Sequence, residues 1–263
     1  MSVRVTMLAA SGWAALAGAA AAQATPQAQS SGAQPRAPTP KVSADGAPDP
    51  IRSSDADGSD FSFEFSAEAL TDYVFRGQDQ TNRRPAGLID ASLDYKSAYF
   101  GVSASNIDYA PLGDRKTDAE VDAFGGYKDE AFGFTYDVGL IYYGYISQPG
   151  GEDYFEGYIR GSRAIGPFKA GLSFYFSPAY SRANGGGVYG EGNLSYDLTR
   201  SWTVSGAVGR GSSDYDYLNW NIGVSYALTR RVLLDLRYSD TDAHDRGRAY
   251  GDRVVASIKL RLP

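Results

Sequence analysis

Apolar and polar residues alternate along most of the chain, and the alternation first appears in segment 61–76, which reads FSFEFSAEALTDYVFR. Its odd positions carry aromatic or small residues such as Phe61 and Phe63, whereas its even positions include Glu64 and Glu68. Successive side chains of a strand point to opposite faces, so the segment predicts a strand with one apolar and one polar face. Strands of soluble proteins are usually about 5–6 residues long, and the greater length of this pattern favours a transmembrane β-barrel.

The same two-residue period recurs through the rest of the chain and predicts about twelve strands in one domain. After the first strand, the others are expected at residues 85–95, 98–108, 117–128, 131–145, 153–163, 168–177, 188–198, 202–210, 217–228, 232–239 and 252–262. Short connections are expected at residues 95–98, 128–131, 164–167, 197–201 and 228–231. Longer ones alternate with them at residues 77–84, 109–116, 146–152, 178–187, 211–216 and 240–251.

An even number of antiparallel strands, short periplasmic turns and longer outer loops are typical of outer-membrane barrels. The expected fold class is therefore all-β, a single transmembrane antiparallel β-barrel over residues 60–263, with both ends on the periplasmic side. A soluble β-sandwich is the alternative, because its strands alternate in the same way. A sandwich accounts neither for the strand length nor for the alternation of long and short connections.

Aromatic residues lie where a membrane barrel has its two interfacial girdles. Those expected beside the short turns are Tyr95, Tyr127, Tyr196, Trp202 and Tyr226, and those expected near the long connections are Tyr73, Phe75, Tyr142 and Tyr238. Aromatic residues are common in strands of every kind, so the girdles support the membrane barrel without deciding it.

The first 24 residues have the pattern of a secretory signal peptide, with Arg4, an Ala-rich apolar run and a cleavage site at Ala22-Gln23-Ala24. A transmembrane helix is the alternative, although the run is short and dominated by Ala. Residues 25–59 are rich in Pro, Ala and Ser and are expected to be a disordered periplasmic segment. Docking of this segment to peptidoglycan or to a partner protein is the alternative.

Composition narrows the function classes. The chain of 263 residues has a formal net charge of −6, which argues against nucleic-acid binding. It has no cysteine, so disulfides and thiolate metal sites are excluded. The mean hydropathy of −0.35 is low for a helical membrane protein, but a barrel is compatible with it, because half of the side chains in each strand face the lumen.

A set of spaced motifs resembles a known family. The motifs are Thr71-Asp-Tyr-Val-Phe-Arg-Gly77, Tyr99-Phe-Gly101 and Ser105-Asn106, followed by Glu120-Val-Asp122 and Asp153-Tyr-Phe-Glu156. They are similar to those of the TorF family of proteobacterial porins over most of residues 60–240. The resemblance implies an outer-membrane barrel with porin activity and supplies no solute. The chain departs from the usual aromatic end of such barrels, because it ends in Leu260-Arg-Leu-Pro263, and less efficient assembly is expected.

If the aromatic face meets lipid, the opposite face lines a polar lumen. The expected pore-lining residues are Glu64, Glu68, Asp72, Asp90, Asp94, Asp118, Glu120, Asp122, Asp137, Arg160, Arg237 and Lys259. The acids belong mainly to the early strands and the bases to the later ones, so acidic and basic walls are expected to face each other. Rings of acids favour cations, and we therefore expect a mildly cation-selective channel for passive diffusion of small hydrophilic solutes or ions.

Two alternatives to an open channel remain at this stage. In the first, the charges pair across the lumen and fill it, as side chains do in small barrels. In the second, the protein is a structural or receptor-like barrel that acts through its outer loops, with 109–116 and 240–251 as the candidates. The partners expected for the channel are outer-membrane lipid and small hydrophilic solutes, without nucleic acid, and a homo-oligomer is compatible with the pattern. The expected location is the outer membrane of a Gram-negative cell, after Sec-type export.

Catalysis is not expected. The chain has one histidine, His244, and no serine is marked as its nucleophilic partner. Asp240, Asp242 and Asp245 surround this histidine with oxygen ligands at a calcium-like spacing, but the segment lacks the glycine of an EF-hand turn. A solvated acidic loop is therefore expected, with no metal site and no cofactor.

Overall fold

The computed structural model describes residues 60–108, 117–146, 153–178, 186–212 and 216–262. The predicted signal peptide, the predicted disordered segment and the loop 109–116 lie outside the described residues, as does Pro263. In the part of the chain that is described, no helix has the length and apolar character needed to cross a membrane.

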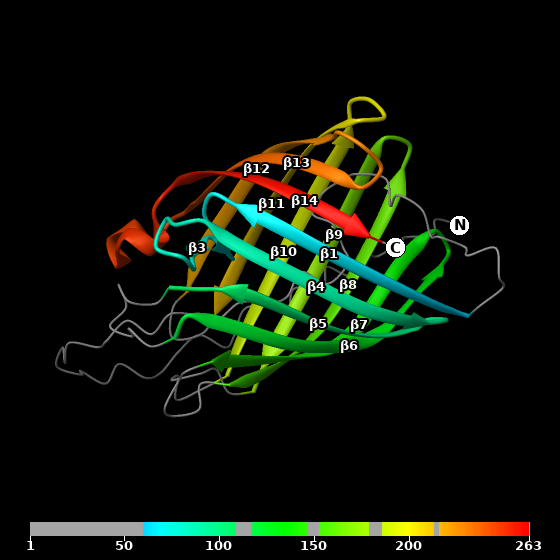
Figure 1. Cartoon of the computed structure of the whole chain (residues 1–263), viewed down its shortest axis with the longest axis horizontal. Helices are drawn as coiled ribbons and strands as arrows, with labels where there is room; N and C mark the ends of the chain where they lie inside the picture. The colour runs from blue at the N-terminus through cyan, green and yellow to red at the C-terminus, as the bar shows by residue number, and fades with distance from the viewer. Residues whose placement is uncertain (1–59, 109–116, 147–152, 179–185, 213–215, 263) are drawn as a thin grey trace, which may run out of the picture. The chain divides into compact units, whose positions relative to one another are not determined.

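Twelve antiparallel strands form one closed barrel, which confirms the predicted fold class (Figure 1). Around the ring β1 is followed by β14, then by each lower-numbered strand down to β4, which pairs with β1 again. The strands are β1 Phe61–Leu70, β4 Ala86–Tyr95, β5 Ala98–Asn106, β6 Ala119–Ala131, β7 Phe134–Ile146, β8 Tyr154–Ile165, β9 Phe168–Ser177, β10 Gly187–Asp197, β11 Trp202–Ser212, β12 Tyr217–Ala227, β13 Val232–Thr241 and β14 Arg253–Leu262.

The two faces of the strands differ as the alternation predicts. Large apolar side chains such as Phe63, Leu140 and Phe174 are exposed on the outside of the ring. The intervening positions point inward and include buried charged residues such as Glu156 and Arg160. An apolar exterior around a polar interior is the arrangement that a membrane-spanning barrel requires.

The first and last strands close the ring. β1 pairs with β14 from Phe65 opposite Leu262 to Leu70 opposite Ser257, and the first four residues of β1 extend beyond this ladder. On its other side β1 pairs with β4 along its whole length, from Phe61 to Leu70. We call the β1–β14 junction the seam. No edge is left open there, because both neighbours of β1 are paired.

One short turn differs from the prediction. β6 continues to Ala131, so the turn expected at residues 128–131 lies instead at Phe132 and Gly133. Both residues have positive φ angles, 55° and 75°, as the two central residues of a type I′ hairpin turn require. Phe132 is 97 % exposed at the tip, whereas the alternation had placed it on the apolar face of a strand. The short hairpin turns that follow β4, β6, β8, β10 and β12 define the short-turn end of the barrel.

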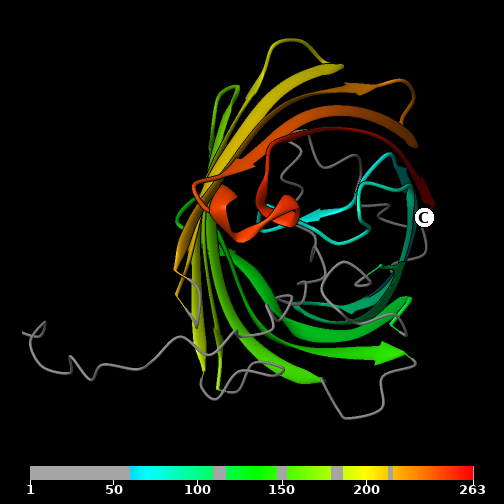
Figure 2. The ribbon, with the colours of Figure 1, turned by 90° about the vertical axis from the view of Figure 1, so that its left-hand side faces the viewer.

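At the opposite end, which we call the long-connection end, the first connection folds into the barrel. The strand expected over residues 61–76 ends at Leu70, and residues 71–85, the inner loop, enter the ring with a small hairpin of β2 Val74–Phe75 and β3 Gln78–Asp79 (Figure 2). A long connection is found here, but it is not the outer loop that was predicted at residues 77–84, because residues 77–81 are buried inside the ring. Tyr73 and Phe75 are 2 % and 9 % exposed, so they do not form part of an interfacial girdle.

The connection between β13 and β14 also lies at the long-connection end and contains two short 3-10 helices, η2 His244–Arg246 and η3 Arg248–Tyr250. Tyr250 is buried and packs edge-on against Tyr217 of β12, with ring centroids 5.4 Å apart. Tyr250 thus anchors this connection to the barrel wall, whereas Asp242, His244 and Asp245 are exposed, as in the solvated acidic loop that was predicted.

Candidate functional site

The inner loop reverses direction through a tight two-residue turn. Arg76 and Gly77 have φ angles of 48° and 81°, and Phe75 pairs with Gln78 across the turn. Two positive φ angles match a type I′ turn, for which glycine is the favoured residue at the second position. Gly77 also lies against the wall, because an added Cβ would be 2.6 Å from both Asn219 Cβ and Thr241 Cγ2. A side chain at this position therefore has no room.

Hydrogen bonds within the inner loop hold its shape. The backbone N–H groups of Thr81 and Arg83 donate to Asp79 Oδ1, at 2.9 and 3.2 Å. The backbone N–H of Gln80 donates to the carbonyl of Tyr73 at 2.8 Å, and the N–H of Tyr73 donates to Thr81 Oγ1 at 3.1 Å. The hydrogen-bonding needs of these buried backbone groups are thus met within the inner loop, so the loop can be buried inside the barrel.

The tip of the inner loop carries a buried ion pair. The Arg76 guanidinium donates two parallel hydrogen bonds to Glu156 of β8, with Nη1–Oε1 at 2.9 Å and Nη2–Oε2 at 2.8 Å. The Tyr143 hydroxyl donates to the same carboxylate at 2.9 Å. The guanidinium carbon also lies 4.7 Å and 4.3 Å from the ring centroids of Tyr175 and Tyr189. Bidentate pairing combined with aromatic faces is the environment to which a planar guanidinium is best suited.

The backbone of the tip is bound to β12. The Tyr217 hydroxyl donates to the Arg76 carbonyl at 2.9 Å and accepts from Gln78 Nε2 at 2.8 Å. The inner loop is therefore held at its tip by β8 on one side of the lumen and by β12 and β13 on the other, since Gly77 contacts Asn219 and Thr241.

The base of the inner loop is held by a second cation. Arg253 Nη1 lies 3.6 Å from Asp72 Oδ2 and 3.3 Å from Asp79 Oδ2. Its Nη2 donates to the carbonyls of Ala249 and Gly251, at 2.8 and 2.6 Å. Arg253, at the start of β14, thus joins the inner loop to the connection that follows β13. Asp72 was predicted as a pore-lining residue, and the structure places it here, in the inner loop and not on a strand.

A third charged cluster lies on the wall itself. Arg160 Nη1 is 3.4 Å from Asp137 Oδ2, and the two residues are direct partners in the β7–β8 ladder. The Tyr99 hydroxyl donates to Asp137 Oδ1 at 2.6 Å and is also hydrogen-bonded to the hydroxyl of Tyr158. The Arg160 guanidinium carbon lies 3.8 Å from the Tyr158 ring centroid. The predicted residues Asp137 and Arg160 are therefore brought together on neighbouring strands.

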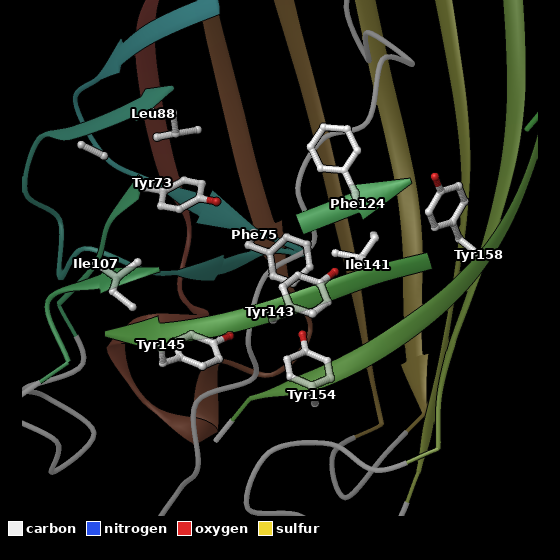
Figure 3. Close-up of a cluster of buried hydrophobic side chains, with 11 residues drawn as sticks. Tyr73, Phe75, Leu88, Ile107, Phe124, Ile141, Tyr143, Tyr145, Tyr154 and Tyr158 are labelled. Carbon is white, nitrogen blue, oxygen red and sulfur yellow. The ribbon is translucent and has the colours of Figure 1, made fainter. Parts of the chain in front are cut away.

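A cluster of buried, mostly aromatic side chains lies beside the inner loop. Figure 3 shows Tyr73 and Phe75 of the inner loop among inward-pointing side chains of the wall strands. The rings of Tyr143 and Tyr154 are stacked, with centroids 4.4 Å apart and planes inclined by 9°. The other buried members of the cluster are Ala86, Leu88, Ile107, Phe124, Ile141, Tyr145 and Tyr158. This cluster and the inner loop together narrow the lumen at the long-connection end.

The remaining predicted residues have separate positions along the inner face. Glu68 and Lys259 form an ion pair across the seam, with Oε2 and Nζ 3.4 Å apart. Arg237 Nη2 is 3.1 Å from Asp235 Oδ2 on the same strand. Glu120 and Asp122 are buried on β6, whereas the other members of the predicted set are half-buried or exposed, namely Glu64, Asp90, Asp94 and Asp118. The ion pairs named in this paragraph join residues of the same strand or of adjacent strands, so they do not cross the lumen. The expectation that acidic and basic walls face each other stays a prediction.

Sequence reasoning did not single out Arg76, Asp79, Glu156 or Arg253 as site residues. The available signal was Gly77, because glycine is favoured at the second central position of a type I′ hairpin turn. That signal predicts a turn, but nothing local states that the turn faces the lumen.

His244 lies outside the strands, in η2, and its Nε2 is 2.6 Å from Asp240 Oδ1. The hydrogen bond to this carboxylate raises the pKa of His244 above its ordinary value of 6.5. Within the described residues, no group of three or more His, Cys, Asp or Glu side chains has the geometry to hold a metal ion.

Comparison with solved structures finds the same fold in two porins. The chain matches the "KdgM porin" with a TM-score of 0.52 at 10 % identity, over 76 % of this chain and 98 % of that one. It matches the NanC porin with a TM-score of 0.51 at 10 % identity, over 77 % of this chain and all of that one. At this identity the likeness concerns the fold alone. No curated protein sequence matches the chain.

A family model matches residues 55–260, which include the whole barrel apart from its last residues. The model is Gcw_chp, and its description reads "Bacterial protein of unknown function". The comparisons do not confirm the finer resemblance to the TorF family. The chain therefore belongs to the Gcw_chp family and folds as a porin-like closed β-barrel.

Proposed function

We propose that the protein is a porin-like channel of a Gram-negative outer membrane, through which ions or small hydrophilic solutes diffuse passively. The observation that carries the proposal is a closed ring of twelve strands with an apolar outside and charged groups inside. A ring without edges satisfies its backbone in lipid, and its polar interior provides a path for water and ions. The fold shared with two porins and the motif resemblance to TorF-family porins support the same function.

We further propose a mild preference for cations. Asp90 accepts a hydrogen bond from the Ser66 hydroxyl at 3.1 Å, and Glu191 accepts one from the Tyr189 hydroxyl at 2.8 Å. A neutral hydroxyl orients a carboxylate without cancelling its charge. Such carboxylates on the inner face attract cations and repel anions, because charged side chains that line a pore set its ionic preference.

Planar-bilayer recording tests both parts. The refolded protein, residues 25–263, should give discrete current steps, and its reversal potential in a KCl gradient should have the sign of a cation-preferring pore. Asp90→Asn and Glu191→Gln should each reduce that preference. Asp129→Asn removes an acid from the outward-facing phase of β6 and should leave it unchanged, so it is the matched control. Heat-modifiable gel mobility verifies folding.

A receptor-like barrel is the second candidate, and the aromatic cluster around Tyr73 and Phe75 favours it, because these side chains occupy the lumen at one end. A folded barrel that never gives current steps would contradict the channel and favour this candidate. The ordered connection with η2 and η3 would then be the first surface to examine for a partner.

A further inference from the structure

The Arg76 guanidinium is held as a bound ligand would be held. Both of its terminal nitrogens donate to Glu156, a carboxylate with 0 % exposure, and aromatic rings lie against its faces. Two N–H donors facing two carboxylate oxygens recognise the planar fork of a guanidinium, and aromatic faces recognise its charge. The chemistry of this environment specifies one class of group, a flat organic cation.

The parts of this environment that belong to the wall lie on strands whose pairing does not involve the inner loop. Glu156, Tyr175 and Tyr189 lie on three consecutive strands, β8, β9 and β10, which are joined by continuous ladders. Tyr143 of β7 orients Glu156 through its hydroxyl, and Tyr189 is itself oriented by its hydrogen bond to Glu191. A site built on paired strands keeps its geometry better than a site built on a loop.

The group that fills this site belongs to a separate and smaller element. Arg76 lies at the tip of the two-residue turn, and the hairpin that carries it pairs β2 with β3 only, apart from the ring of wall strands. A displacement of the hairpin would carry the guanidinium and Phe75 away, whereas the carboxylate and the two tyrosines belong to the wall strands.

We propose that Glu156, Tyr175 and Tyr189 form a binding site for small guanidinium-type cations, which Arg76 occupies as a tethered occupant while the inner loop is folded in. This site rests on the proposed function, because solutes must reach the lumen to bind there. It adds to that function the class of solute that is recognised. A free cation of this class competes with Arg76, and its binding favours release of the inner loop, because both groups require the same carboxylate.

Isothermal titration calorimetry of the refolded protein in detergent, with methylguanidinium as the probe, tests the site directly. Arg76→Ala should bind methylguanidinium at least about tenfold more tightly than the unmodified protein, since the tethered competitor is gone. Adding Glu156→Gln to Arg76→Ala should remove that gain. Arg237→Ala is the matched control, because it removes a wall guanidinium that pairs with Asp235, and it should bind methylguanidinium as the unmodified protein does. Methylammonium, which lacks the planar fork, should bind Arg76→Ala more weakly than methylguanidinium.

Arg76→Ala leaves a buried carboxylate without its main partner, so heat-modifiable mobility must first show that the variant folds. If it does not, Arg76→Gln, which retains an amide donor, takes its place in the same titrations. Equal affinity in the folded variant and the unmodified protein, or a gain that survives Glu156→Gln, would overturn the site. If Arg76→Ala binds methylguanidinium but the barrel gives no current steps, the site stands and the channel function is contradicted. If the barrel conducts but Arg76→Ala does not bind methylguanidinium, the channel stands and the site is contradicted.

Discussion

At the scale of single residues, the lumen is organised by buried charges that need partners. Glu156 and Arg76 are almost fully buried, and each satisfies the other through two hydrogen bonds. Removing one member of a buried pair is strongly destabilising, by about 3–5 kcal/mol, because the other charge is left without compensation. The contacts of Arg253 with Asp72 and Asp79 follow the same logic at the base of the inner loop. The position of this loop is therefore determined by complementary charges as well as by apolar contacts.

The histidine provides a pH-dependent probe of the long-connection end. The hydrogen bond that His244 donates to the Asp240 carboxylate raises the pKa of His244, so the folded protein binds this proton more tightly than the unfolded chain does. The resulting stabilisation is fully present below pH 6.5 and is lost as the pH rises through the raised pKa. NMR titration of histidine-labelled protein should give one imidazole resonance, because the chain has one histidine, with a midpoint above 6.5.

Asp240→Asn is the control for this titration. It removes the charge that favours the imidazolium and should return the midpoint toward the ordinary value. A midpoint at or below 6.5 in the unmodified protein would contradict the hydrogen bond between His244 and Asp240.

At the scale of elements, the alternation of apolar and polar residues predicted the strands well because lipid and lumen impose opposite demands on the two faces. It failed at the end of the first strand, where Tyr73 and Phe75 continue the apolar phase. An aromatic side chain that enters a lumen cluster has the same place in the pattern as one that meets lipid, so periodicity cannot distinguish them. It also misplaced the β6–β7 turn, since Phe132 continues the phase although it lies at the tip. The ion pairs that hold the inner loop join segments far apart in sequence, as Arg76 with Glu156 and Arg253 with Asp79 do, and no local pattern encodes them.

Gly77 tests whether the inner loop narrows the lumen. Gly77→Ala places a methyl group against Asn219 and Thr241 at a positive φ, and the backbone conformation alone costs about 1–2 kcal/mol. The hairpin should therefore leave its place, and the single-channel conductance of the folded variant should rise.

The control is Gly161→Ala on β8, where an added Cβ meets nothing within 4 Å. It should leave the conductance as it is in the unmodified protein. Equal conductance for the unmodified protein and a folded Gly77→Ala variant would mean that the inner loop does not limit the current.

At the scale of the whole molecule, the barrel depends on the seam between its first and last strands. The Glu68–Lys259 ion pair joins direct partners in that ladder, and both side chains are largely shielded from water. Since the seam ladder is shorter than the β1–β4 ladder, side-chain contacts across it carry a larger share of the junction.

Charge reversal at the seam should weaken barrel closure. Lys259→Glu places two carboxylates opposite each other and should lower the free energy of unfolding in urea by about 1 kcal/mol. Adding Glu68→Lys restores opposite charges and should recover most of that loss. A double variant as unstable as Lys259→Glu alone would exclude an interaction between these two positions.

The inner loop is the first connection of the barrel, yet many of the residues that hold it belong to the last three strands. Its contacts with Tyr217, Asn219, Thr241 and Arg253 bridge sequence separations of 139 residues or more, as the hydrogen bond between Gln78 and Tyr217 illustrates. Contacts of such long range form late, because the intervening chain must be ordered first. An N-terminal half of the barrel would therefore contain the inner loop but not the residues of β12, β13 and β14 that hold it. We thus expect the hairpin to take its place only after the C-terminal strands have paired, so a folded-in hairpin would report that these strands are in position.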